Sequence, residues 1–147
     1  MVPSQTIVDF IKGFEACRLA AYMPTPNDRP TIGWGTTGGD VVMGLVWTQQ
    51  DCDARFTTDL DKFAAGISRL LTGETSQNQF DAMLSLAYNI GLGNFGSSTL
   101  LRLHNAADFE AVPAQFLRWN LQKGQVLAGL TRRRQGEAAI YQGTQPT

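Results

Sequence analysis

The spacing of the apolar residues changes between residues 18 and 42, and this change limits the chain to few folds. Before it, Ile7, Phe10, Ile11 and Phe14 recur at the spacing of one helix face, with Ser4 or Thr6 able to cap the start. Within it lie short β-like pieces separated by prolines and glycines. We predict strands over 19–22, 31–36 and 41–43. A sheet of this size is not stable alone, so it must pack against helices.

All patterns after residue 47 favour helices. A long helix is predicted from a cap at Thr48, with the acid Asp51 at its third position, to about Gly73. Further helices are predicted after a cap at Thr75-Ser76, from Ser97-Ser98 and after a cap at Asp108, with a final helix over 131–141 and a loop over 120–128. The predicted fold class is therefore α+β: mostly helical, with a small antiparallel sheet lobe joined by a long helix to a helical lobe. We expect one domain over 1–147, with a sheet lobe at about 15–47, a linking helix at about 48–72 and a helical lobe at about 74–143 that includes the N-terminal helix.

The charge distribution argues against nucleic acid as a partner, because the net charge of the 147 residues is only −1. We also expect a monomer. From Arg118 onward the sequence contains five basic residues and one acid, Glu137, which gives this segment a net charge of +4. This run is either a solvated helix face or a local positive field, which lies beside an acidic site or faces an anionic polymer.

The cysteines and the N-terminus bear on the compartment. Cys17 and Cys52 have no metal-site spacing and form no disulfide framework, so buried free thiols are expected, while a single bridge between them stays open. Residues 1–6 carry no export pattern, and the apolar stretch 41–47 is too short to span a bilayer. The sequence therefore predicts a protein that starts in the cytoplasm.

Several kinds of chemistry lack their residues. The single histidine, His104, has no partner at metal-ligand spacing and is expected to be a surface or cap residue, so no metal or cofactor is predicted. No serine lies in a nucleophile elbow. The glycines of Gly33-Trp34-Gly35 lack the lysine of a phosphate loop, and we expect them to let the backbone pass close to a helix or a ligand.

Carboxylates remain, and they suit acetal hydrolysis. That reaction needs one acid that is protonated near neutral pH and a second that is ionised. Glu15 fits the first role, because it ends the first helix between apolar residues where negative charge is disfavoured. Asp28 fits the second because it lies in a polar turn, and Thr31 can hold a water. Taken alone, Glu15 is equally able to pair with an arginine, and Asp28 to stabilise its turn.

Several ordered blocks resemble the lysozymes of tailed phages, the T4-type muramidases or endolysins of glycoside hydrolase family 24. The blocks cover nearly the whole chain and are E-x-x-R-L-x-x-Y at 15–22, T-I-G-W-G at 31–35, Q-F-D-A at 79–82, A-Y-N-I-G at 87–91, S-T-L-L at 98–101, F-L-R-W at 116–119 and G-L-T-R-R-R-x-x-E at 129–137.

The resemblance implies a role for individual residues. It makes Glu15 the general acid and Thr31 the residue that positions water, and it places Tyr88 and Asn89 along a sugar groove between the lobes. It also implies that an arginine of the last helix pairs with Glu15, and of the three in that run we favour Arg132.

One position departs from the family pattern. The usual aspartate lies two residues after the tyrosine of the first block, where this chain has Pro24, and Asp28 is the only carboxylate between Glu15 and Thr31. Either Asp28 replaces that aspartate, as we predict, or Glu15 and Thr31 work alone.

The resemblance implies an enzyme that cuts the β-1,4 bond between N-acetylmuramic acid and N-acetylglucosamine of bacterial peptidoglycan, with inversion, during host cell lysis. It also implies action on the wall from the host cytoplasm after a holin-type protein has permeabilised the membrane. Two alternatives stay open: a lytic transglycosylase that uses Glu15 alone, and a wall-binding or structural phage protein on the same fold.

Overall fold

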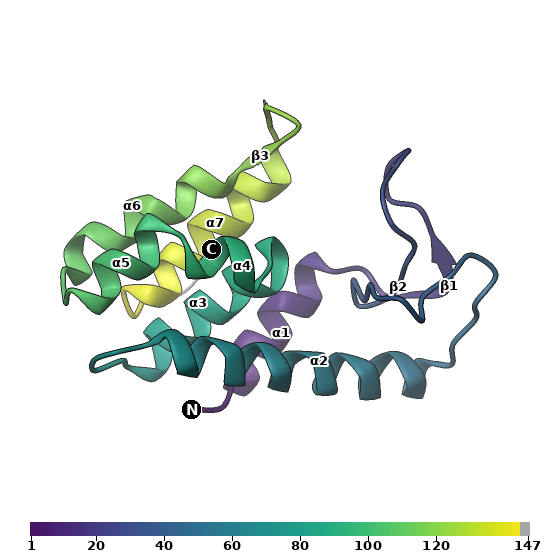
Figure 1. The fold of residues 1–147 in the computed structure, drawn as a ribbon, viewed down its shortest axis with the longest axis horizontal. Helices are drawn as coiled ribbons and strands as arrows, with labels where there is room; N and C mark the ends of the chain where they lie inside the picture. Colours follow the sequence, from purple (N-terminus) through teal and green to yellow (C-terminus); the bar gives the residue numbers. More distant parts are fainter. Residues whose placement is uncertain (145–147) are drawn as a thin grey trace. The chain divides into compact units, whose positions relative to one another are not determined.

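The computed structural model describes residues 1–144 and divides into two compact units (Figure 1). Unit 1 contains Met1–Ile7 and the chain from Phe63 onward, and unit 2 contains Val8–Lys62. Both divisions fall inside helices, α1 (Gln5–Phe14) and α2 (Gln49–Leu70). The predicted fold class is confirmed, since most elements are helices and the sheets are small and antiparallel. The prediction of one domain stays a prediction.

The main sheet of unit 2 is centred on β1 (Arg18–Tyr22), which pairs antiparallel with β2 (Thr31–Gly33). On the other side of β1, Ala21 N–H donates to Leu45 O at 2.9 Å, and Trp47 N–H donates to Leu19 O at 2.8 Å. The strand predicted over 41–43 is therefore wrong, because residues 42–45 form a turn and the next residues pair with β1. A valine-rich stretch such as 41–43 favours a strand, but it forms one only where the edge of another strand is available for pairing. Here residues 45–47 pair with the edge of β1.

A tight turn ends β2 earlier than predicted. Ile32 and Thr36 exchange two backbone hydrogen bonds of 3.0 and 2.8 Å, which folds the predicted strand 31–36 back on itself. Gly33 and Gly35 lie in this turn with φ of 63° and 81°, values that favour glycine. The turn brings the residue-35 backbone to the place where the candidate site is built.

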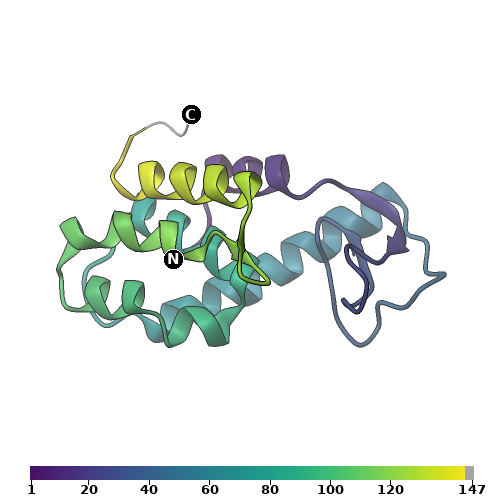
Figure 2. The same cartoon turned by 90° about the horizontal axis from the view of Figure 1, so that it is seen from above.

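Helix α2 begins with a reciprocal cap, as its sequence predicts. Thr48 N–H donates to Asp51 Oδ2 at 2.9 Å, and Asp51 N–H donates to Thr48 Oγ1 at 3.1 Å. Figure 2 shows α2 as one continuous helix. It buries Cys52, Phe56 and Leu60 within unit 2, and it ends at Leu70, before the predicted stop at Gly73.

Unit 1 is helical, and its described elements follow the predicted order. They are α3 (Gln77–Ile90), α4 (Leu92–Gly96), α5 (Thr99–Asn105), η1 (Phe109–Ala111), α6 (Val112–Phe116), η2 (Leu117–Trp119), β3 (Leu121–Gln122), β4 (Gln125–Val126) and α7 (Ala128–Tyr141). Ser76 forms a capping box with Gln79 at the start of α3, and Ser98 caps α5, both as predicted. Helix α3 is buried from Phe80 to Ala87, as its apolar circumference indicates.

Some elements of unit 1 differ from the prediction. The glycine-rich segment after α3 forms α4, which the sequence did not predict, because a five-residue helix is too short to show a period. The helix expected after Asp108 is split into η1, α6 and η2, with Pro113 in the first turn of α6. The expected loop 120–128 holds the hairpin β3–β4 (Figure 1), and α7 starts at Ala128.

The basic C-terminal run is not a uniformly solvated helix face, so that interpretation is wrong for two of its arginines. Arg133 and Arg134 are buried and pair with buried Glu137, at 3.4 Å and 2.7 Å between guanidinium Nε and carboxylate oxygens. Ser85 of α3 donates its hydroxyl to the same carboxylate. These two arginines of the run therefore lie inside unit 1 and not on a solvated face.

His104 is buried at 2% exposure, which corrects the expectation of a surface residue. Its Nδ1 lies 2.6 Å from the Tyr141 hydroxyl, and its Nε2 lies 2.9 Å from Thr75 Oγ1. Burial lowers the pKa of His104 and raises that of Tyr141. The sequence shows that His104 lies near a helix end. The neighbours that bury its ring, Thr75 and Tyr141, come from the segment before α3 and from α7.

Both cysteines are free thiols, so no bridge joins them. Cys52 is buried as expected, while Cys17 is half-buried. Burial, together with the neighbouring Cys17 thiol, raises the pKa of Cys52 to about 11. Among residues 1–144, no helix combines the length and apolar character that a membrane span requires.

Candidate active site

Glu15 follows the last residue of α1 and continues its hydrogen-bond pattern. The Glu15 N–H donates to Ile11 O at 3.0 Å, so the helix fixes the backbone of Glu15 although this residue lies just beyond its end. The side chain is half-buried. The carboxyl group is thus presented by a rigid element, as the sequence predicts.

The Glu15 carboxyl lies directly against the backbone of Gly35. A β-carbon built on Gly35 would lie 2.5 Å from Glu15 Oε2, which is closer than real contacts allow, and 3.0 Å from Glu15 Cδ. The φ of 81° at this residue independently favours glycine. The sequence predicted a close approach to a helix or a ligand, and at Gly35 the group approached is instead the carboxyl of Glu15, the residue after α1.

Thr31 opens β2 and is buried at 6% exposure. It lies opposite Tyr22 in the sheet register, and its Oγ1 donates to Arg29 O at 3.2 Å. A hydroxyl that donates to a carbonyl keeps its lone pairs for accepting a hydrogen bond, for example from a water.

Asp28 is exposed and holds its own turn together. Thr25 Oγ1 donates to Asp28 Oδ2 at 3.2 Å, and Arg29 N–H donates to Asp28 Oδ1 at 2.8 Å. The Asp28 N–H also donates to Thr25 O at 3.2 Å. These are the contacts of the turn-stabilising alternative, and a role for Asp28 in chemistry stays a prediction.

The predicted substrate-binding residues belong to unit 1. Tyr88 lies in the last turn of α3, where its ring packs on Phe63 with centroids 5.4 Å apart. Asn89 and Arg132 are exposed, Asn89 at the end of α3 and Arg132 on α7. Arg132 thus differs from its two buried neighbours, Arg133 and Arg134.

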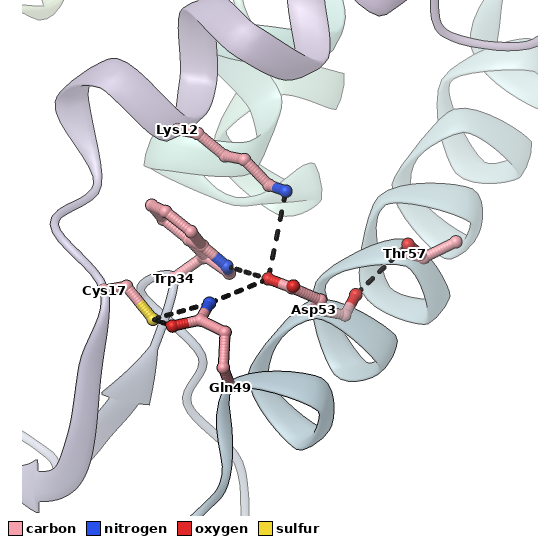
Figure 3. Close-up of polar contacts among 6 residues, drawn as sticks. All are labelled: Lys12, Cys17, Trp34, Gln49, Asp53 and Thr57. Atoms are coloured by element: carbon pink, nitrogen blue, oxygen red, sulfur yellow. Dashed lines mark hydrogen bonds and ion pairs between the residues drawn. The ribbon is translucent and has the colours of Figure 1, made fainter.

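A second polar cluster of unit 2 was not predicted from the sequence. We call it the Asp53 cluster, and it consists of Lys12, Trp34, Gln49 and Asp53 (Figure 3). Asp53 Oδ1 accepts hydrogen bonds from Trp34 Nε1 at 2.7 Å and from Gln49 Nε2 at 3.1 Å, and it lies 3.9 Å from Lys12 Nζ.

The Asp53 cluster holds a charged carboxylate. The hydrogen bonds from Trp34 and Gln49 keep the pKa of Asp53 below its ordinary value. Lys12 Nζ also lies over the Trp34 ring, 5.0 Å from its centroid, at cation–π distance. The sequence shows Asp53 only as a polar position of a helix, since two of its partners lie on other elements.

Residues 1–144 contain no group of three or more His, Cys, Asp or Glu side chains that could hold a metal ion.

Comparison with known proteins identifies the class to which this fold and site belong. The Phage lysozyme family model matches residues 12–137, and the chain belongs to the phage lysozyme family. It is 39% identical over 139 residues to the endolysin of Bacillus phage B103, which covers 94% of this chain and 53% of that protein.

Solved structures agree with this assignment. The endolysin from Escherichia coli O157:H7 phage FAHEc1 is 35% identical, with a TM-score of 0.86 over 100% of this chain and 98% of that one. The muramidase domain of SpmX from Asticaccaulis excentricus is 34% identical, with a TM-score of 0.84 over 94% and 95%. Four endolysins similar in sequence, including that of phage B103, are longer proteins, and the chain spans 53–60% of their length.

Proposed function

We propose that this protein is a peptidoglycan hydrolase that cleaves the β-1,4 bond between N-acetylmuramic acid and N-acetylglucosamine. The observation that carries the proposal is the Glu15 carboxyl held against Gly35, in a chain of the phage lysozyme family. The names endolysin and muramidase of its relatives are consistent with this substrate.

In the proposed reaction, Glu15 donates its proton to the glycosidic oxygen as the bond from that oxygen to C1 breaks. Positive charge develops on the sugar ring, and a water held by Thr31 attacks C1 from the opposite face, which gives inversion. The proton released by the water goes to a base, and we assign that role to Asp28. For this role, Asp28 must share or exchange the hydrogen bonds that it accepts in its turn.

The alternative of a lytic transglycosylase is favoured by the contacts of Asp28. Both of its carboxylate oxygens already accept hydrogen bonds within the turn, so a mechanism that needs only Glu15 would leave them undisturbed. In that reaction Glu15 gives its proton to the glycosidic oxygen as the bond from that oxygen to C1 breaks. The C6 oxygen of the muramic acid then attacks C1 and gives its proton to the Glu15 carboxylate, so the product carries a 1,6-anhydro ring instead of a reducing end.

Substrate contacts are proposed for Tyr88, Asn89 and Arg132. Tyr88 offers a ring face of the kind that packs on sugars, Asn89 offers an amide donor and acceptor, and Arg132 offers a positive charge to the anionic wall. We further propose that the protein acts in host cell lysis after a holin-type membrane protein has opened a path from the cytoplasm. The family resemblance supports this partner, and lysis of cells that express the protein with and without a holin tests it.

The test of the chemistry uses purified peptidoglycan with wild-type protein, Glu15→Gln, Asp28→Asn and, as a matched control, the exposed Glu110→Gln. Turbidity and the ends of the released fragments are measured. The loss of a general acid is expected to lower the rate of Glu15→Gln by about 100-fold to 10,000-fold, while Glu110→Gln stays at the wild-type rate.

The product ends separate the candidates. Reducing ends support hydrolysis, 1,6-anhydro ends support the transglycosylase, and binding without cleavage by the wild type supports a wall-binding protein. Undiminished cleavage by Glu15→Gln would contradict both enzymatic mechanisms. Undiminished cleavage by Asp28→Asn would remove only the assignment of Asp28 as the base.

A further inference from the structure

Three of the chain segments that surround Glu15 are tied to one carboxylate oxygen. Lys12 lies three residues before Glu15 on the last turn of α1, Trp34 directly precedes Gly35, and Gln49 contacts Cys17, which lies two residues after Glu15. All three side chains meet Asp53 Oδ1 (Figure 3). The segments before and after Glu15, and the turn on which its carboxyl rests, therefore share one anchor on α2.

The link through Trp34 is the most direct. The indole donates to Asp53 at 2.7 Å, and the next residue is the glycine whose β-carbon position would collide with Glu15 Oε2. The Trp34 ring also lies 6.4 Å from the ring of buried Phe56, which limits its freedom on a second side. A shift of the indole would move the backbone that supports the Glu15 carboxyl.

The link through Gln49 reaches the other side of Glu15. The Gln49 amide donates to Asp53 and also lies 3.6 Å from the Cys17 sulfur, at the entry to β1. The Gln49 amide oxygen lies 3.8 Å from the same sulfur. The amide thus connects the anchor on α2 with the short segment between Glu15 and the sheet.

The exposure of the cluster argues for a positional role. The side chain of Asp53 is 47% exposed and that of Lys12 is 30% exposed. Contacts of exposed charges contribute little to the free energy of unfolding because water screens them. They still fix direction, since a carboxylate that accepts two hydrogen bonds and faces an ammonium has few orientations that satisfy all three.

We propose that Asp53 is a positioning residue that holds the Glu15 carboxyl against Gly35 by anchoring Trp34, Gln49 and Lys12. The inference rests on the proposed function of Glu15 as the general acid. Asp53 itself transfers no proton and touches no reacting atom in this role.

The test compares Asp53→Ala, Asp53→Asn and Trp34→Phe with the wild type and with Asp61→Ala, an exposed aspartate of the same helix outside the cluster. The rate constant kcat and the KM are measured on soluble peptidoglycan strands, and the midpoint of urea unfolding is measured for each protein. The nuclear magnetic resonance signal of the Trp34 indole N–H reports on its hydrogen bond without reference to activity.

Asp53→Ala is expected to lower kcat by about tenfold to 100-fold, because small misplacements of a catalytic group have effects of this size, with KM changed less than twofold. Asp53→Asn keeps an acceptor oxygen and is expected to recover most of kcat. Trp34→Phe should lower kcat, and adding Asp53→Ala to it should bring little further loss, because both remove the same link.

Several results would overturn the inference. They are a wild-type kcat in Asp53→Ala, an unmoved Trp34 indole signal in that variant, or a loss of kcat that follows only the unfolded fraction in the urea experiment. An inactive wild type would instead overturn the proposed function, and in that case a shifted indole signal in Asp53→Ala would still show that Asp53 anchors Trp34.

Discussion

Two carboxylates of this protein each gather three side chains, and the two clusters differ in exposure. Glu137 of unit 1 contacts Ser85, Arg133 and Arg134 and is fully buried. Asp53 of unit 2 contacts Trp34, Gln49 and Lys12 and is 47% exposed. We refer to the first group as the Glu137 cluster.

The difference in exposure changes what each cluster can do. Burial raises the pKa of Glu137, while Arg134, Arg133 and Ser85 oppose this by favouring the charged form. The hydrogen bonds of Trp34 and Gln49 lower the pKa of Asp53 and outweigh a smaller effect of burial. Changes in the Glu137 cluster should therefore lower the free energy of unfolding of unit 1, because removing one partner of a buried ion pair is strongly destabilising. The Asp53 cluster can be altered without that penalty, so its effects should appear in activity.

The largest expected effect is that of Glu137→Gln. The substitution removes the carboxylate with which Arg133 and Arg134 pair inside unit 1, and removing one partner of a buried ion pair costs about 3–5 kcal/mol. The free energy of unfolding from urea titration measures it, with Glu110→Gln as the exposed control. Full stability in Glu137→Gln would contradict the assignment of a folding role to this cluster.

A smaller effect, on activity, is expected for Gly35→Ala, with Gly44→Ala as its control. Both glycines have positive φ, so each alanine carries a strain of about 1–2 kcal/mol. Only at Gly35 does the new β-carbon meet the Glu15 carboxyl, since nothing lies within 4 Å of the corresponding position at Gly44.

Gly35→Ala is therefore expected to lower kcat by about 100-fold, the scale set by a displaced catalytic group, whereas Gly44→Ala should keep the wild-type kcat. Kinetics on peptidoglycan strands, below the unfolding temperature of both variants, measure this. Equal losses in the two variants would show that strain, and not contact with Glu15, is the cause.

The smallest effect concerns His104, which is buried like Glu137 but without an ion pair. Burial lowers the pKa of folded His104, so the unfolded chain, with a pKa of about 6.5, binds the proton more readily. The stabilising contribution is complete above the unfolded pKa and is lost as the pH falls through the lower folded pKa.

Urea unfolding of the wild type between about pH 7 and 5 should therefore show falling stability toward acid. His104→Gln, which does not titrate there, should show a flatter dependence. Since His104 is the only histidine of the chain, the difference belongs to one group. Parallel curves would contradict the depressed pKa.

Local sequence was enough for the features that depend on neighbours along the chain. Ser76 caps α3 and Thr48 caps α2 as predicted, because each hydroxyl bonds to a backbone group three residues away. The position of Glu15 at a helix end follows from the period of the preceding apolar residues in the same way.

Features that depend on distant partners were missed or wrong. No local sequence pattern distinguishes the buried Arg133 and Arg134 from the exposed Arg132. His104 was expected at the surface, but Thr75 and Tyr141 contact its ring and it is buried. The strand expected over 41–43 failed because pairing requires the edge of β1, which residues 45–47 occupy.

The sequence by itself determined the longer helices, the first two strands of the small sheet, the membership in the family through its ordered blocks, and Glu15 as the first candidate for chemistry. The elements follow from apolar period and caps, which act over a few residues, and the family follows from the order of the motifs along the chain. Only the tertiary structure decided what supports Glu15: a glycine backbone twenty residues away at Gly35, and the Asp53 cluster behind it. Contacts of this kind depend on how elements pack, and packing leaves no local period in the chain.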